Sequence, residues 1–364
     1  MRLAEIQGQD RAVSALRRDL MGRRLAPAYL FVGPESVGKC TTAIAFARAL
    51  LCAEGRSGAS DASGASDASG ASDACEASDA SEPCRACRKV EAGSHPDLMV
   101  VRRDGQFIKI GEWGKDRKAD EPPQIRQLIV AAQRRPFEGP VKVLVVDEAH
   151  RMTLSAANAL LKTLEEPPAD TVIVLTATTL GALPQTVASR CRVIRFRAME
   201  RPWLSSEIER VRGLPPGEAR LLAAFAEGRM DRALTADPEE VSERREKALE
   251  LLDAGLGGRT GEILRGVAGV GRSRENAEAL LDVLLSLVRD VCAAQREAPA
   301  ELLVHEDLAD ELFRRARAYP RRALEALFER ARTLRTDIRV RNANPQLGWE
   351  ALLLGPGRMA GVKA

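Results

Sequence analysis

The feature that most constrains the fold is a short loop, Gly33–Cys40, between an apolar segment and a helical one. The apolar segment Ala28–Val32 is predicted to be a strand, and a helix is predicted at Thr41–Leu51. Glycines let backbone N–H groups surround phosphate oxygens, and a helix N-terminus adds positive potential. The loop therefore predicts a P-loop nucleotide-binding domain of the α/β class. The predicted phosphate ligands are Gly33, Gly38 and Lys39.

The last position of this loop departs from the usual pattern. A hydroxyl from Ser or Thr ordinarily binds Mg²⁺ there, whereas Cys40 offers a soft thiol to a hard ion. Thr41 comes next, but on a helix its side chain points about 100° away, so it is an imperfect substitute. We therefore expect ATP with Mg²⁺ to be able to bind through these residues, with hydrolysis in doubt.

Strand and helix patterns alternate through the first part of the chain. The further predicted strands are Leu98–Val101, Val141–Val146, Thr171–Thr176 and Val193–Phe196. Continuous apolar strands separated by helices are typical of a parallel sheet with helices on both faces. We therefore expect an α/β domain with a five-stranded parallel sheet at residues 1–199. Only helical patterns follow, which predicts a small helical lid domain at 200–240 and an all-α domain at 241–364.

Composition and charge exclude several classes of protein. The 55 basic and 52 acidic residues give a net charge of +3, which creates no global basic field for nucleic acid. The first segment, Met1–Arg24, is charged and amphipathic rather than a signal peptide, and no apolar run is long enough to span a bilayer. We expect a cytoplasmic protein without membrane contact. In that reducing compartment the seven cysteines are better candidates for metal binding or burial than for disulfides.

Two carboxylates follow the predicted strand Val141–Val146, as in a Walker B motif. Asp147 would lie in the Mg²⁺ shell, and Glu148 would orient or polarise an attacking water molecule. The alternative is an acidic pair that only caps the next helix.

Further segments carry a resemblance to a known family. Ile6–Gln9, Leu154–Pro168 and Ser189–Cys191, together with the phosphate loop, closely resemble the AAA+ subunits of bacterial DNA polymerase III clamp loaders. The resemblance covers about residues 1–200. It implies that Arg190 is an arginine finger acting in the ATP site of a neighbouring subunit, and that Thr178 holds the sensor-1 position. An ordinary surface arginine is the alternative at position 190.

A second departure from the motor pattern lies in Gly228–Leu234, which resembles the family's sensor-2 segment. Asp231 stands at the position of the sensor arginine, and Arg232 follows one residue later. With Cys40, this pattern resembles delta-prime members more than gamma/tau motors. The resemblance implies a subunit of a DNA-directed DNA polymerase holoenzyme, a nucleotidyltransferase, with its own ATPase weak or absent. A gamma/tau-like motor and a nucleotide-free scaffold remain as alternatives.

The resemblance also implies partners and a collar. The chain would join gamma/tau and delta subunits in a hetero-oligomeric, pentameric core that loads the sliding clamp onto primer–template DNA. Its C-terminal helices, residues 241–364, would form the oligomerising collar.

A structural zinc module is the last implication, in an insertion at about 52–94. Cys52 and Cys84–Cys87 match family ligand positions, whereas Ser81 stands where another ligand belongs. Cys75 lies within a Ser-Gly-Ala-Ser-Asp-Ala repeat, read as a disordered surface tract that would let it reach the metal. The expected Zn²⁺ ligands are Cys52, Cys75, Cys84 and Cys87. Three thiolates with His95, or a site that has lost its metal, are the alternatives.

Overall fold

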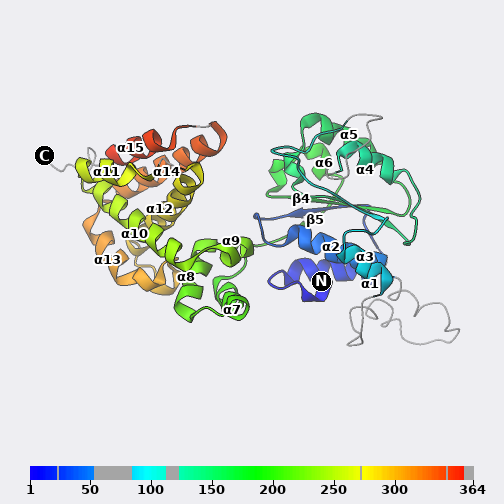
Figure 1. Cartoon of the computed structure of the whole chain (residues 1–364), viewed down its shortest axis with the longest axis horizontal. Helices are drawn as coiled ribbons and strands as arrows, with labels where there is room; N and C mark the ends of the chain where they lie inside the picture. Colours follow the sequence, from blue (N-terminus) through cyan, green and yellow to red (C-terminus); the bar gives the residue numbers. More distant parts are fainter. Residues whose placement is uncertain (23, 53–83, 112–122, 271–272, 342, 356–364) are drawn as a thin grey trace. The chain divides into compact units, whose positions relative to one another are not determined.

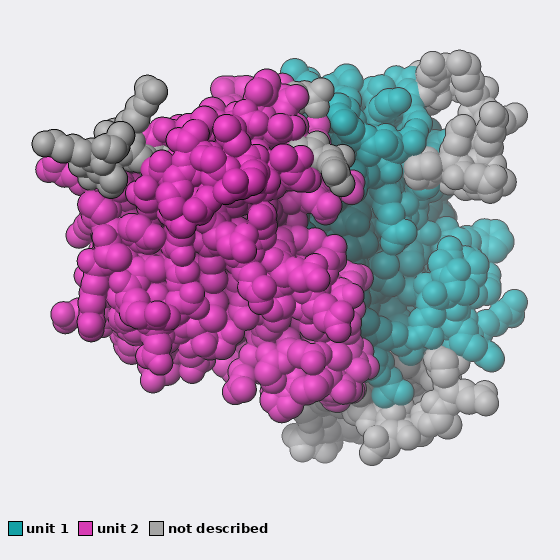
Figure 2. Space-filling model, turned by 60° about the vertical axis from the view of Figure 1, so that its left-hand side comes forward, with its two compact units in different colours: residues 1–200, 228–230 teal, residues 201–227, 231–364 magenta. Residues whose placement is uncertain are grey.

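The computed structural model describes residues 1–22, 24–52, 84–111, 123–270, 273–341 and 343–355. The repeat and Cys75 lie outside the described residues. Figure 2 shows two compact units, the first made of residues 1–200 and 228–230, the second of 201–227 and 231–364. Whether 200–240 and 241–364 form separate domains stays a prediction.

The first unit is an α/β domain (Figure 1). Its strands are β1 (Ala28–Val32), β2 (Leu98–Val101), β3 (Lys142–Val146), β4 (Thr171–Ala177) and β5 (Arg192–Arg195). Its helices are α1 (Asp10–Met21), α2 (Lys39–Leu51), α3 (Arg85–Glu91), α4 (Ile125–Ala132), α5 (Leu154–Glu165) and α6 (Gln185–Ala188). All strand pairs are parallel, in the order β2-β3-β4-β1-β5. The predicted five-stranded parallel sheet is confirmed.

Alternate side chains of the strands face two separate layers of helices. Leu30 and Ile173 pack on the side of α4 and α5, whereas Tyr29 and Phe31 pack with Phe46 of α2 on the opposite side. Each of these side chains is fully buried, which stabilises the fold by roughly 1.5–3 kcal/mol for each large apolar group. Strand β1 lies between β4 and β5, so the loop that follows it emerges from within the sheet rather than at an edge.

Four elements have boundaries that differ from the sequence-based prediction by one or two residues. Strand β3 begins at Lys142 rather than Val141, and β4 ends at Ala177 rather than Thr176. Helix α2 begins at Lys39 rather than Thr41, because left-handed Gly38, with φ of +88°, ends the loop directly before it. Strand β5 begins one residue earlier than expected and ends at Arg195. Phe196 still donates its backbone N–H to Val32 at 2.7 Å, so the pairing with the central strand continues past the strand end.

The second unit consists of helices. They are α7 (Arg201–Arg212), α8 (Pro216–Ala226), α9 (Met230–Thr235, whose first residue belongs to the first unit), α10 (Pro238–Leu256), α11 (Thr260–Val267), α12 (Arg274–Ala294), α13 (Ala309–Ala318), α14 (Arg321–Arg341) and α15 (Pro345–Leu354). Leu, Val and Ala side chains of α10, α12 and α14 form one core, in which Trp349 of α15 is fully buried. The predicted helical C-terminal part is confirmed. None of the helices described is long and apolar enough to cross a bilayer.

Candidate functional site

The phosphate loop follows β1, and each of its two predicted glycines has its own structural reason. A Cβ at Gly33 would lie 2.5 Å from the carbonyl oxygen of Phe196 and 2.7 Å from its Cβ. Gly33 is therefore required by the close approach of the chain after β5. Gly38 has nothing within 4 Å, but its positive φ favours glycine and turns the chain into α2. The N–H groups at the start of α2 consequently face the loop.

The side chain of Lys39, a predicted phosphate ligand, folds back onto the phosphate loop. Its Nζ donates to the carbonyl of Gly33 at 2.8 Å and to that of Pro34. Burial lowers the pKa of this ammonium, while the carboxylates of Asp147 and Glu35 oppose the shift. The cation therefore lies among backbone carbonyls, within reach of the space that the loop surrounds.

Cys40 and Asp147 lie close together. Burial raises the pKa of the Cys40 thiol to about 12, and the nearby Asp147 carboxylate adds to the shift. The Asp147 carboxylate and the Arg102 guanidinium are the charged groups that act on this thiol, the first raising its pKa and the second lowering it. The thiol is therefore protonated at neutral pH, and it is a poor Mg²⁺ ligand. The Thr41 side chain is exposed to solvent.

A buried threonine organises the two carboxylates. Thr176 Oγ1 donates to Asp147 Oδ1 at 2.7 Å and accepts the backbone N–H of Glu148 at 2.9 Å. Glu148 has a left-handed backbone, with φ of 53°, and its carboxylate pairs with Arg103 at 2.7 Å. Thr176 was not predicted as a site residue, because it lies inside an apolar strand. Thr178 lies half-buried just beyond the end of β4.

The sensor-2-like segment places a different arginine near the phosphate loop. Gly228, with φ of +81°, approaches Ala198 so closely that a Cβ there would lie 2.7 Å from the Ala198 Cβ. Arg229 is thereby placed 3.6 Å from the carboxylate of Glu35 in the phosphate loop. Arg232, by contrast, pairs with Asp282 of α12 at 3.2 Å. The sequence resemblance pointed to positions 231 and 232, and Arg229 was not predicted.

Arg190 lies on the turn after α6 at the surface of the first unit. Its side chain is about one-third exposed, with Nη2 2.6 Å from Glu165 Oε1. Nη1 donates to the carbonyl of Thr186 at 2.7 Å. The next residue, Cys191, is half-buried, and burial raises the pKa of its thiol to about 11. Because the Arg190 side chain is about one-third exposed, its guanidinium is accessible to a second molecule.

Three of the four predicted zinc ligands meet beside α3. The Sγ atoms of Cys52, Cys84 and Cys87 lie within 4.8 Å of one another. The first two are 3.8 Å apart, and two sulfurs sharing a tetrahedral Zn²⁺ at about 2.3 Å would also lie about 3.8 Å apart. The Cys87 N–H donates to Cys84 Sγ at 3.4 Å. The cluster fits a metal ion.

Charge near this cluster also favours a metal. A hydrogen bond with Cys52, followed by burial, raises the pKa of Cys87, because neighbouring thiols cannot all ionise without a cation. Arg48 contacts Cys87 and pairs with Glu91 at 2.7 Å. A metal would allow the thiols to ionise together.

His95 is the less suitable fourth ligand. It is buried near Cys52, and its Nε2 has no hydrogen-bond partner among the described residues. Its Nδ1, however, accepts the N–H of Asp97 at 3.1 Å, so in the neutral ring Nε2 carries the proton. His95 is also outside the group of sulfurs that lie within bonding range of one ion. The geometry therefore favours a fourth metal ligand other than His95.

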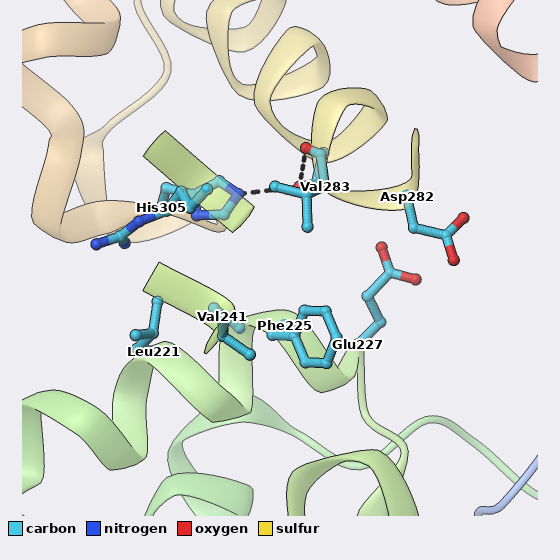
Figure 3. A pocket seen from close by; sticks show the side chains of 10 residues that line it. Leu221, Phe225, Glu227, Val241, Asp282, Val283 and His305 are labelled. Carbon is cyan, nitrogen blue, oxygen red and sulfur yellow. Dashed lines mark hydrogen bonds between the residues drawn. The ribbon is translucent and has the colours of Figure 1, made fainter. Parts of the chain in front are cut away.

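A cavity in the second unit is lined by α8, α10, α12 and His305 (Figure 3). Phe225 and Val283 present apolar side chains to it, while His305 Nε2 lies 2.9 Å from Ser286 Oγ. Its volume of about 20 Å³ suffices for one water molecule. It is too small for an organic ligand.

Comparison with known proteins gives concordant results. The family model described as "DNA polymerase III, delta subunit" matches residues 8–200. A DNA polymerase III subunit delta' of Bacillus subtilis is 29% identical over 304 residues, covering 82% of each chain. A subunit delta' of Pseudomonas aeruginosa is 34% identical over 49% of this chain and 45% of its own. The subunit tau of Escherichia coli is 27% identical over 99% of this chain and 52% of its own.

Proposed function

Because the chain belongs to the DNA polymerase III clamp-loader family of AAA+ proteins, we propose that it is the delta-prime-like subunit of such a loader. It would assemble with gamma/tau and delta subunits into a pentameric core. That complex would place the sliding clamp on primer–template DNA in an ATP-dependent reaction. Similarity to delta' over 82% of both chains supports this assignment.

The proposal rests on the combination of two features: Arg190 is partly exposed, and position 40 is a cysteine in place of the usual Ser or Thr. Arg190 is presented at the surface, where a neighbour's nucleotide could meet it. There it would neutralise charge developing on the transferred phosphoryl group. Cys40 deprives the chain's own site of the usual hydroxyl, which argues against a gamma/tau-like motor role. ATP would bind at Gly33–Cys40 with little hydrolysis.

Reconstitution with gamma/tau and delta subunits tests the finger. The complex should contain one active motor site, next to this chain, with the other sites inactivated at their phosphate-loop lysines. Arg190→Ala is then expected to lower DNA-dependent ATP hydrolysis by about a thousandfold or more. Arg11→Ala, at an exposed position of α1, is the control and should leave the rate unchanged.

Two outcomes would replace the proposal. Unchanged hydrolysis with Arg190→Ala would make the chain a scaffold without catalysis in trans. ATP turnover by the isolated chain, abolished by Lys39→Ala, would make it a motor subunit.

A structural Zn²⁺ on Cys52, Cys84 and Cys87 completes the proposal, with Cys75 as the fourth donor. The sulfur spacing and the adjacent Arg48 support the three described ligands. A closed site with four thiolates would stabilise α3 against the end of α2 and leave no position for a substrate.

A further inference from the structure

Two consecutive arginines lie beside the two Walker B carboxylates. Strands β2 and β3 are paired in register, with Val101 opposite Val146, and the N–H of Asp147 donates to the carbonyl of Val101 at 2.9 Å. The residues that follow each strand therefore leave the sheet side by side. In this way Arg102 and Arg103 are placed against Asp147 and Glu148.

Each arginine has a distinct contact. Arg103 Nε lies 2.7 Å from Glu148 Oε2 and thus pairs with the carboxylate that would otherwise polarise water. Arg102 directly follows Val101, whose carbonyl accepts the N–H of Asp147, and its charge is near enough to the Cys40 thiol at the start of α2 to lower the pKa of that thiol. Arg102 is exposed to solvent, so its N–H groups are open to a ligand.

The surrounding donors do not fit Mg²⁺. This ion requires about six hard oxygen ligands in near-octahedral geometry. Cys40 supplies sulfur, Asp147 already accepts a hydrogen bond from Thr176, and Glu148 is paired with an arginine. A divalent cation would also meet the nearby guanidinium of Arg102.

The same groups suit a polyphosphate. A guanidinium binds phosphate oxygens bidentately, and its charge is fixed over the whole working pH range. Lys39 and the N-terminus of α2 add positive potential on the other side of the loop. Arg229 is a further cation near Glu35.

We propose that this site binds the polyphosphate of a nucleotide without a divalent cation, with Arg102 supplying the positive charge that Mg²⁺ would otherwise provide. Arg103 holds Glu148 away from any reacting water. The inference rests on the proposed binding of nucleotide at Gly33–Cys40. On this proposal, the cysteine at position 40 accompanies the replacement of Mg²⁺ by an arginine as the cation beside the polyphosphate.

Titration of the full chain with a fluorescent ATP analogue, in EDTA and in excess MgCl₂, tests the inference. Wild-type affinity should agree within about twofold between the two conditions. Arg102→Ala should weaken binding in EDTA by about tenfold or more, as expected for loss of a hydrogen bond to a charged group. Arg11→Ala serves as the matched arginine control. The double variant Cys40→Ser/Arg102→Ala should bind more tightly with Mg²⁺ than without it, because it regains a hydroxyl and loses the competing cation.

The outcomes separate this inference from the proposed function. Binding that requires Mg²⁺, or that is unaffected by Arg102→Ala, overturns the inference alone. Absence of binding by the wild-type chain in both conditions overturns nucleotide occupancy as well. The role of Arg190 is judged independently in the reconstituted loader.

Discussion

The guanidinium of Arg190 is paired with Glu165 at the end of α5, with 2.6 Å between Nη2 and Oε1. The two side chains are 34% and 49% exposed, so water screens the pair. Exposed pairs of this kind contribute about 0.2–1 kcal/mol. The proposed finger is thus held weakly against its own subunit, and this contact must break before it reaches a neighbour's phosphate.

Replacing the partner of the finger should increase activity modestly. Glu165→Gln removes the negative charge that opposes extension of Arg190. We expect ATP hydrolysis by the reconstituted loader to rise by no more than about fivefold, which corresponds to the upper limit for such a pair. Glu166→Gln, at the exposed neighbouring position, is the control. A fall as large as that of Arg190→Ala would show instead that Glu165 orients the finger for catalysis.

Loss of one cysteine should remove the metal. We expect the purified full chain to contain zinc in equimolar amount, measured by mass spectrometry of the elements. Cys84→Ser should release it and lower the thermal unfolding temperature, because binding of a structural metal is coupled to folding. Cys292→Ser, at a half-buried thiol of α12, is the matched control and should keep the zinc. Wild-type protein without zinc, or full retention in Cys84→Ser, would contradict the assignment.

The first glycine of the phosphate loop should be needed for stability even without nucleotide. In Gly33→Ala the new Cβ would lie within 3 Å of three atoms of Phe196, two of them backbone. We expect the free energy of unfolding in urea to fall by roughly 1–3 kcal/mol, typical of overpacking. Gly181→Ala, which has nothing within 4 Å, should change it little. Equal free energies of unfolding for both variants would show that glycine at position 33 is not needed for stability and matters only for phosphate binding.

The fold could be predicted from the sequence because its strongest signals are local. Strands β1, β3 and β4 are largely apolar, fully buried runs, and the loop at Gly33–Cys40 directly precedes a helix. The approach of residues 31, 32 and 177 to one another then follows from parallel pairing around β1. Signals of this kind need no knowledge of distant contacts.

The missed site residues depend on contacts between distant segments. In the sequence Thr176 is one residue of an apolar strand. Only the pairing of β3 with β4 shows that its hydroxyl donates a hydrogen bond to Asp147. Arg229 is placed by the close approach of Gly228 to Ala198, thirty positions earlier in the sequence. Arg102 follows a strand at the far edge of the sheet. Sequence spacing carries none of these relationships.

The pH dependence of stability should report on His305 in the second unit. It is buried, and desolvation lowers its pKa to about 4, against about 6.5 in an unfolded chain. The charges of Asp290 and Asp307 oppose this shift, whereas those of Arg245 and Arg289 add to it. Since the folded state holds a neutral ring, the unfolded state takes up the proton first as pH falls. Stability from the neutral ring is therefore complete above about pH 6.5 and is lost progressively toward pH 4.

The corresponding experiment compares chemical denaturation at about pH 7.5 and about pH 4.5. Between these two pH values the free energy of unfolding of the wild-type protein should fall by up to about 3 kcal/mol more than that of His305→Gln, because the glutamine does not titrate. Buried carboxylates titrate in both proteins, so the difference between the two isolates the histidine. Gln346→His, which places an imidazole at an exposed position of α15, is the control for an unperturbed ring. Identical pH profiles of wild type and His305→Gln would show that the imidazole is hydrated enough in the folded state to accept a proton at its ordinary pKa.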